Sequence, residues 1–176
     1  MKKLGFTLME ILMALAIVGV VAALTIPSFV ANSQTQAREA TFAATVSDVE
    51  NALTTMIVIE EANDLMETRF YDSLNTSAPA DDTADILGNH LKLADATETL
   101  SVSDYTGEKR PPAEGNYQFT LKTGAFFIVK LAVDEDNEKF ADAWIDVNGQ
   151  DLPNNMNIDI RKYNLMLDGS LELDEN

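Results

Sequence analysis

The first 27 residues constrain this chain more than any other stretch. Two lysines and a Gly-Phe pair are followed by a run that stays largely apolar to Ile26. As a helix, residues 6–26 would span roughly 32 Å and match the ~30 Å hydrocarbon core of a bilayer. Because Lys2 and Lys3 precede the apolar run, we expect the N-terminus to stay in the cytoplasm and the remaining chain to lie outside.

One acid, Glu10, interrupts this apolar run shortly after its start. A lone carboxylate in lipid is unfavourable, so an intramembrane acid indicates a function and a positive partner. An α-amino group at Phe6 would lie one helical turn away, and the amino terminus of a neighbouring subunit is a second candidate. Both partners require cleavage between Gly5 and Phe6, because only then does Phe6 carry a free amine.

Residues 2–12 resemble the class III signal of type IV pilins and type II secretion pseudopilins. That signal combines a short basic leader, a Gly-Phe junction followed by Thr-Leu, and a glutamate at the start of an apolar helix. The resemblance implies that a prepilin peptidase cuts after Gly5 and N-methylates Phe6. It also implies that Glu10 sets the register between neighbouring subunits of a helical filament, and that Pro27 bends the first helix.

Two other interpretations of this segment remain. A secretory signal peptide would be cut after its apolar region at a small-residue site, for which residues 14–16 and 22–24 are candidates. A plain membrane anchor would need no cleavage. The signal peptide explains neither Glu10 nor the Gly5–Phe6 junction, and the plain anchor leaves Glu10 without a role.

Composition limits the function of the remaining chain. The 176 residues include 12 Lys and Arg against 29 Asp and Glu, for a formal charge of −17. Such a surface repels phosphates, so we expect no nucleic acid binding by this chain alone. The chain has no cysteine. Many major pilins close their C-terminal loop with a disulfide, so the resemblance favours the pseudopilins, in which calcium can hold the equivalent loop.

We expect an α+β fold of the pilin type. A long bent N-terminal helix, with a transmembrane half and an amphipathic half, would pack on a C-terminal antiparallel β-sheet. The expected divisions are a leader at 1–5, a transmembrane or filament-core helix at 6–27, the amphipathic half of the helix at 28–67, a variable segment at 68–115, and the sheet with its C-terminal loop at 116–176.

Periodicity supports this division. Five apolar residues follow one face of a helix, namely Phe42, Val46, Val49, Leu53 and Ile57. Residues 56–59 are more apolar than one face requires, which fits core packing or a subunit contact. A short helix is possible at 85–93. From residue 117 the period changes to two, and strands are predicted at 116–121, 125–133, 143–147, 163–167 and 170–173.

A second motif lies between the third and fourth predicted strands. Asp146, Asn148, Asp151 and Asp159 surround Gly149, and their oxygens are of the kind that calcium binds in proteins. The segment also resembles an Asp-x-Asn-Gly pattern followed by Pro-Asn near the C-terminus of many pseudopilin-like proteins. We therefore expect no obligatory cofactor but a possible structural Ca²⁺ at these four residues.

The alternatives to a calcium loop are less specific. Asp and Asn side chains also stabilise turns by bonding to nearby backbone N–H groups. The acidic turn with Asp134, Asp136 and Glu138 is a rival cation site, although a solvated run of charge explains it equally well.

No catalytic motif is present, so we expect that the chain is not an enzyme. Its only histidine, His90, fits a structural or exposed role. The function predicted from the resemblance is that of a structural subunit, processed by prepilin peptidase and assembled into a type II secretion pseudopilus. The alternatives are a major or minor pilin of a type IV or competence pilus, or a membrane-anchored extracytoplasmic binding module that never polymerises.

The partners follow from the same resemblance. They are prepilin peptidase, other copies or related pilin subunits, the assembly ATPase with its platform machinery, and the bacterial inner membrane. We expect a single membrane pass with an extracytoplasmic domain, and a filament in the periplasm or at the cell surface.

Overall fold

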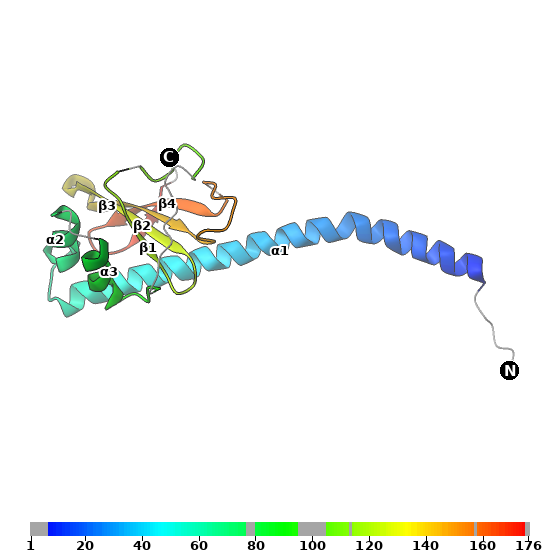
Figure 1. Ribbon diagram of the computed structural model, residues 1–176, viewed down its shortest axis with the longest axis horizontal. Coiled ribbons are helices and arrows are strands. Elements are labelled where there is room, and N and C mark those ends of the chain that lie inside the picture. The colour runs from blue at the N-terminus through cyan, green and yellow to red at the C-terminus, as the bar shows by residue number, and fades with distance from the viewer. Residues whose placement is uncertain (1–6, 77–79, 95–104, 113, 157, 175–176) are drawn as a thin grey trace. The chain divides into compact units, whose positions relative to one another are not determined.

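A computed structural model describes residues 7–76, 80–94, 105–112, 114–156 and 158–174. The chain divides into two compact units, Met1–Ala40 and Thr41–Asn176. The long helix α1 (Leu8–Ile59) contributes residues to both units (Figure 1).

Three short helices follow α1. They are the 3-10 helix η1 (Leu65–Glu67), α2 (Arg69–Asn75) and α3 (Ala80–Gly88). The carboxylate of Asp64 caps η1 by accepting a hydrogen bond from the Met66 N–H, and the hydroxyl of Thr68 caps α2 by accepting one from the Tyr71 N–H. These caps explain why two separate short helices begin within five residues of each other.

Five strands form one antiparallel sheet in the order β1-β2-β3-β4-β5. Their bounds are β1 (Tyr117–Thr120), β2 (Phe126–Asp134), β3 (Lys139–Asp146), β4 (Ile160–Met166) and β5 (Leu171–Leu173). A short 3-10 helix, η3 (Glu135–Asn137), connects β2 to β3. Every strand pairs with its neighbour in sequence, so the sheet is a meander. The α+β fold, with a long N-terminal helix followed by an antiparallel sheet, is confirmed.

Several predicted boundaries were wrong. The amphipathic helix was predicted to reach residue 67, but α1 ends at Ile59, and Glu61 takes a left-handed conformation with φ of 55°. A residue at positive φ cannot continue a right-handed helix. The short helix predicted at 85–93 is α3, which begins at Ala80 and ends at Gly88.

Two strands begin earlier than the alternation of residues indicated. β3 begins at Lys139. Its pairing with the next strand shifts register between Lys139 and Ala141, and this irregularity interrupts the alternation of apolar and polar residues at the start of β3. β4 begins at Ile160, and Arg161 occupies a position on the helix-facing side. The Arg161 guanidinium carbon lies 4.1 Å from the centre of the Phe42 ring, so a cation–π contact accommodates a charged residue there.

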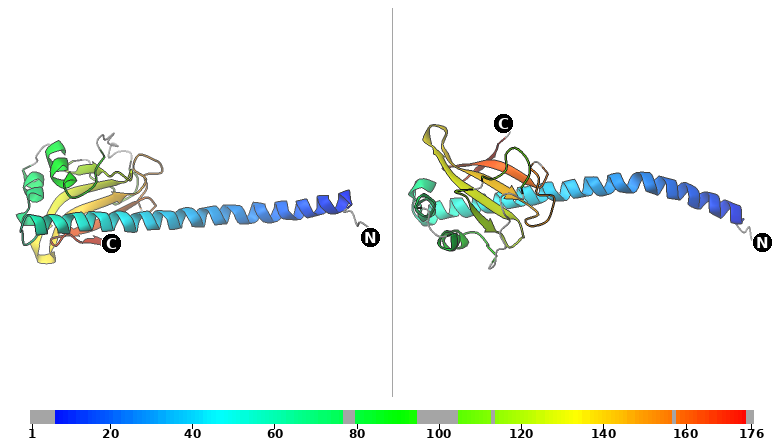
Figure 2. Two further views of the ribbon diagram at one scale, coloured as in Figure 1. Left: turned by 90° about the horizontal axis from the view of Figure 1, so that it is seen from below. Right: turned by 45° about the horizontal axis from the view of Figure 1, so that its top comes forward.

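The main core lies between the sheet and the part of α1 in the second unit (Figure 2). Phe42, Val49 and Leu53 of the predicted stripe are buried, and Val46 and Ile57 pack against the same cluster partly exposed. Facing side chains come from β1 to β5, and they include Phe119, Phe127, Val129, Ala143, Ile145, Tyr163 and Leu165. The helical stripe therefore covers one face of the sheet.

The opposite face of the sheet is also buried, by a smaller cluster. Its members are Tyr105, Phe126, Ile128, Trp144, Met156 and Ile160. Tyr105 comes from the loop before β1, and Met156 comes from the connection between β3 and β4. Because both faces are covered, β2 reads as a nearly continuous apolar run rather than as an alternating strand.

Candidate functional site

The N-terminal part of α1 exposes its apolar side chains. Leu8, Leu15, Leu24 and Phe29 have exposed fractions of 76%, 64%, 74% and 74%, and no residue of the most apolar window is buried. Among the described residues, α1 is the one helix that is long and apolar enough to cross a membrane. This surface requires an apolar surrounding, which a bilayer or a bundle of like helices provides.

Glu10 forms a capping box with Thr7 at the start of α1. The Glu10 Oε2 accepts hydrogen bonds from the backbone N–H of Thr7 at 2.8 Å and from its hydroxyl at 2.9 Å. In return the Thr7 hydroxyl oxygen accepts one from the N–H of Glu10 at 3.2 Å. Such reciprocal bonds satisfy donors that the first turn of a helix leaves without partners.

The capping box was missed in the sequence, although its signal was present. Ser or Thr followed three residues later by Glu or Gln is the usual pattern, and Thr7 and Glu10 match it. Glu10 therefore has a local role in its own helix besides any role between subunits. Gly5 and Phe6, the predicted cleavage junction, lie outside the described residues.

Pro27 lies inside α1, and the helix continues on both sides of it. Proline has no N–H, so it cannot donate the bond that the carbonyl of Ala23 would accept. Nearby hydroxyls bond to backbone carbonyls, from Thr25 to Val21 at 2.9 Å and from Ser28 to Thr25 at 2.9 Å. The bend expected at Pro27 stays a prediction.

The second candidate site is the connection between β3 and β4, where Asp146 and Asp159 are fully buried. The Asp146 Oδ1 accepts hydrogen bonds from the N–H groups of Asn148 and Gly149 at 3.2 and 3.0 Å. The Asp159 carboxylate accepts them from Asn154 and Asn155 at 2.7 and 2.6 Å. The two carboxylates thus organise the two halves of the loop, as Asx turns do.

Two oxygens in this loop are buried without a hydrogen-bond partner among the described residues. They are Oδ2 of Asp146 and Oδ1 of Asn148. Burial raises the pKa of Asp146 to about 7. Hydrogen bonds from Asn148 and Gly149 lower this pKa, and the charge of Asp159 raises it. The site therefore favours a positive partner or a proton at Asp146.

The other predicted ligands are arranged differently. Asp151 is exposed, and its backbone carbonyl accepts a hydrogen bond from the Asn148 amide. With its amide nitrogen turned toward the loop, Asn154 donates to the carbonyls of Gly149 and Asp151 at 3.2 and 2.9 Å. The part of the chain that the structure describes contains no group of three or more His, Cys, Asp or Glu arranged to hold a metal. Any cation here would depend on amide and carbonyl oxygens beside Asp146.

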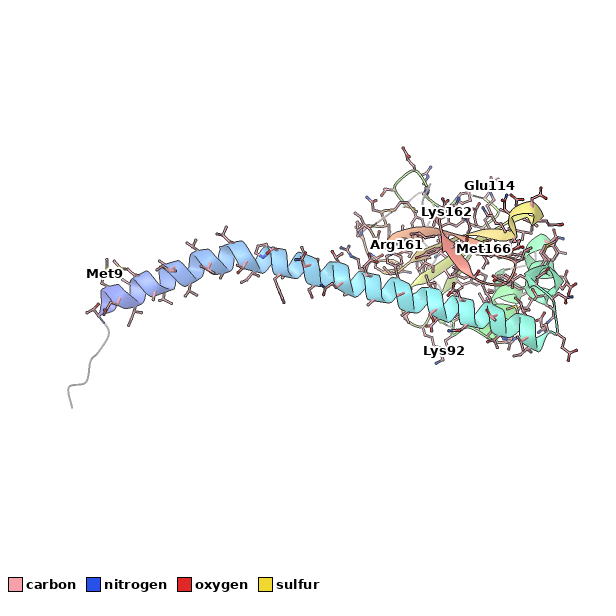
Figure 3. All side chains as sticks on the ribbon, turned by 180° about the vertical axis from the view of Figure 1, so that it is seen from behind. Met9, Lys92, Glu114, Arg161, Lys162 and Met166 are labelled. Carbon is pink, nitrogen blue, oxygen red and sulfur yellow. The ribbon has the colours of Figure 1, made fainter. Side chains whose placement is uncertain are left out.

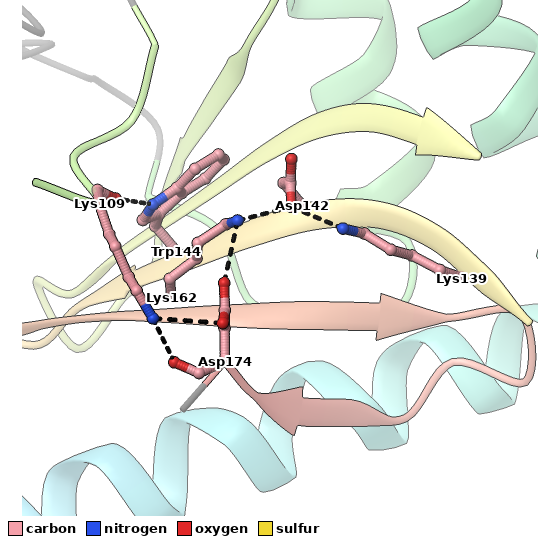
Figure 4. Close-up of polar contacts among 6 residues, drawn as sticks. All are labelled: Lys109, Lys139, Asp142, Trp144, Lys162 and Asp174. Carbon is pink, nitrogen blue, oxygen red and sulfur yellow. Dashed lines mark hydrogen bonds and ion pairs between the residues drawn. The ribbon is translucent and has the colours of Figure 1, made fainter. Parts of the chain in front are cut away.

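A chain of alternating charges joins the C-terminal end to the outer face of the sheet (Figure 4). The Asp174 carboxylate contacts the ammonium groups of Lys109 at 3.2 Å and Lys162 at 3.0 Å. Lys162 also contacts Asp142 at 3.0 Å, and Asp142 contacts Lys139 at 2.8 Å. We call these five residues the lysine–aspartate chain.

The lysine–aspartate chain holds a loop over the single tryptophan. The indole N–H of Trp144 donates to the backbone carbonyl of Lys109 at 2.6 Å, and the Lys162 ammonium lies 5.8 Å from the centre of the Trp144 ring. Sequence reasoning missed this contact because its members are far apart in the chain. It ties the loop before β1 to β4 and to the C-terminal end without a disulfide.

Comparison with known proteins identifies one segment. Residues 1–26 match the family model of the prokaryotic N-terminal methylation motif, the class III signal of type IV pilin-like proteins. No curated protein and no solved structure matches the chain. The motif and the long N-terminal helix support a type IV pilin-like protein.

Proposed function

We propose that this chain is a structural subunit of a type IV filament, assembled into a type II secretion pseudopilus. Prepilin peptidase would remove residues 1–5 and methylate Phe6. The subunit would wait in the inner membrane with its domain outside, until an assembly ATPase and its platform machinery insert it into the filament. The role would be structural rather than catalytic.

The observation that carries this proposal is the methylation motif, which spans residues 1–26 and so includes the exposed apolar start of α1. In lipid or in a filament core, such a helix buries its side chains against other apolar groups. Glu10 is the one charged side chain of its first turns. A neighbouring amino terminus would lower the cost of its burial and would reward one register between subunits.

Substitutions at Glu10 test this proposal and separate its charge from its capping role. Glu10→Gln keeps the capping pattern but removes the charge, whereas Glu10→Val removes both. We expect both variants to enter the membrane and to be cleaved, and assembled filament to fall at least about tenfold, as expected for loss of one partner of a buried ion pair. Sheared filaments and the membrane fraction are quantified by immunoblot.

Normal assembly of the Glu10→Gln variant would contradict the charge role and leave capping as the function of Glu10. If the unaltered protein is cleaved but never assembles in its native cell, the membrane-anchored binding module becomes the better account.

Two features favour the pseudopilus over a type IV or competence pilus. The chain has no cysteine to close a C-terminal loop, and the segment from Asp146 to Asp159 resembles one found in pseudopilin-like proteins. Deletion of the gene tests this choice. A pseudopilin deletion stops secretion of exported enzymes and leaves surface pili intact, whereas a pilin deletion removes pili, adhesion or DNA uptake.

We also propose that Ca²⁺ binds the loop between β3 and β4. Asp146 Oδ2 and Asn148 Oδ1, which are buried without partners among the described residues, support this proposal. Asp151 and Asp159 are the further candidates, and Asp159 would contribute mainly charge because both of its oxygens already accept backbone hydrogen bonds. Carboxylate, amide and carbonyl oxygens are the ligands that Ca²⁺ takes.

Calorimetry of the full chain in detergent tests calcium binding. We expect heat of binding on addition of Ca²⁺ and a melting temperature that falls with EGTA. Asp146→Asn should abolish both effects. Asp134→Asn, in the exposed turn beside η3, is the matched control and should change neither. An identical response in both variants, or no heat in the unaltered protein, would end the calcium proposal.

A further inference from the structure

A polar groove lies between α1, the segment after α3 and the turn between β1 and β2. Its volume is about 380 Å³. Its lining includes Asn51, Thr55, His90, Lys92, Lys122 and Thr123, and Asp48 is its one acid. A second hollow of about 600 Å³ shares Lys92 and Lys122 and also contains two acids, Asp81 and Asp85. On a strongly acidic chain, the first groove is thus a surface where positive charge exceeds negative charge.

The backbone holds the two lysines of this groove together. The N–H of Lys122 donates to the carbonyl of Lys92 at 3.0 Å, and Leu93 and Leu121 pair beside them. Both lysine residues are exposed, and Figure 3 shows Lys92 at the surface. Neither ammonium forms an ion pair with another described residue. The lysine groove, as we call it, therefore offers two cations to a partner.

The connection between β2 and β3 carries the opposite charge. Asp134, Glu135, Asp136 and Glu138 are all exposed there. The bond from the Leu167 N–H to the Glu138 carbonyl, at 2.8 Å, brings the turn between β4 and β5 to the same place. A further bond joins the Leu65 N–H to the Leu167 carbonyl at 2.9 Å. Three further exposed acids, Glu61, Glu67 and Asp168, lie close in sequence to these bonded residues.

The cations near this acidic end are already paired. Arg69 contacts Glu60 at 2.9 Å, and Lys139 contacts Asp142 at 2.8 Å. We call residues 134–138 the acidic turn. It projects from the domain with an excess of negative charge and has no described lysine or arginine in an ion pair with it.

The turn between β1 and β2, which carries Lys122, and the connection between β2 and β3, which carries the acidic turn, lie at opposite ends of β2 (Figure 1). In an antiparallel meander, successive turns alternate between the two ends of the strands. The turn with Lys122 precedes β2 and the acidic turn follows it, so the nine residues of β2, about 30 Å of strand, separate them. One copy therefore cannot bring its own acidic turn to its own lysine groove.

We propose that the lysine groove of one copy receives the acidic turn of a second copy in the filament. This inference rests on the proposed function and specifies a contact between subunits. Complementary charge identifies the occupant, because a second copy of this chain carries an exposed acidic turn. In a filament we expect this contact to repeat head to tail, so that each copy offers its groove to one neighbour and its acidic turn to another.

Disulfide crosslinking of the full chain in its native cell tests the contact, because the chain has no cysteine of its own. The double variant Lys122→Cys with Asp136→Cys should give a ladder of oligomers on oxidation. The two single variants, produced together, should give dimers only, since each copy then offers one half of the contact. Lys122→Cys with Glu172→Cys is the matched control and should give no ladder.

Charge reversal provides a second measurement. Lys122→Glu or Asp136→Lys alone should reduce assembled filament roughly fivefold or more, since like charges across an interface repel. The two changes in one chain should restore assembly. This contact would be overturned if the unaltered protein forms filaments, the double cysteine variant gives no ladder, and the double charge reversal does not restore assembly. The filament proposal would then still stand. Dimers from Asp136→Cys alone would show a turn-to-turn contact and would also overturn it. Absence of filaments in the unaltered protein would overturn both proposals.

Discussion

The capping box of Thr7 and Glu10 gives the acid of the apolar segment a partner inside its own helix. If cleavage occurs after Gly5, Thr7 becomes the second residue of the mature chain and the capping box is retained. Glu10 then stabilises the first turn of α1 before assembly, and the same carboxylate is available to an incoming amino group. A local role and a role between subunits are compatible at this residue.

Asp142 provides a pH-dependent test of the lysine–aspartate chain. Burial raises the pKa of Asp142, but the hydrogen bonds and charges of Lys139 and Lys162 outweigh it, so this pKa lies below its ordinary value of 3.8. A lowered pKa in the folded state stabilises the fold above the unfolded value, and this stabilisation is lost as the pH falls through the folded value.

We therefore expect Asp142→Asn to lower the free energy of unfolding by about 1 kcal/mol at neutral pH. The difference from the unaltered protein should disappear well below pH 3.8. Urea unfolding of the full chain in detergent, followed by the fluorescence of its single tryptophan, measures it. Asp136→Asn, in the exposed acidic turn, is the control. A difference that does not depend on pH would show that Asp142 acts through packing.

Individual site residues were predictable only in part. The chemistry of Asp146 and Asp159 indicated them as site residues. The backbone N–H groups that donate hydrogen bonds to their carboxylates could not be predicted, because they depend on the path of the loop. The partners of Asp174 come from the loop before β1 and from β4. No spacing in the sequence brings these residues together, because the folded sheet does so.

The second part of α1 stabilises the domain by covering one face of the sheet. Leu53 is fully buried in this contact, whereas Val58, five residues later, is 70% exposed. Leu53→Ala should lower the free energy of unfolding by about 2–5 kcal/mol through the cavity that it leaves. Val58→Ala should change it by no more than about 0.5 kcal/mol.

Thermal unfolding of both variants measures this difference. Equal and small effects would mean that the helix does not pack on the sheet. A large effect of Val58→Ala on filament assembly without an effect on unfolding would instead assign the exposed residues at the end of α1 to a subunit contact.

Helices and strands were predicted where neighbouring residues in the sequence carry a clear apolar pattern. The stripe from Phe42 to Ile57 and the alternation of β1 are such cases. Prediction failed where other interactions decide. The short helix α2 depends on the cap from Thr68 and on burial of Phe70. The early starts of β3 and β4 depend on a register shift and on the contact of Arg161 with Phe42.

The molecule combines an apolar N-terminal segment, which requires an apolar surrounding, with a domain that carries the lysine groove and the acidic turn on different sides of β2. The first feature was evident from the sequence, because hydropathy and the methylation motif are local. The second was not, because the lysine groove gathers residues from α1, from the segment after α3 and from the turn before β2. Together they fit the proposed role as a filament subunit.

The N-terminal mass of the chain in purified filaments tests this function most directly. We predict that the N-terminal peptide begins at Phe6 and carries one added methyl group on its amine. Recovery of Met1 at the N-terminus, or cleavage after the apolar run near Ala23, would contradict the assignment to pilin-type filaments.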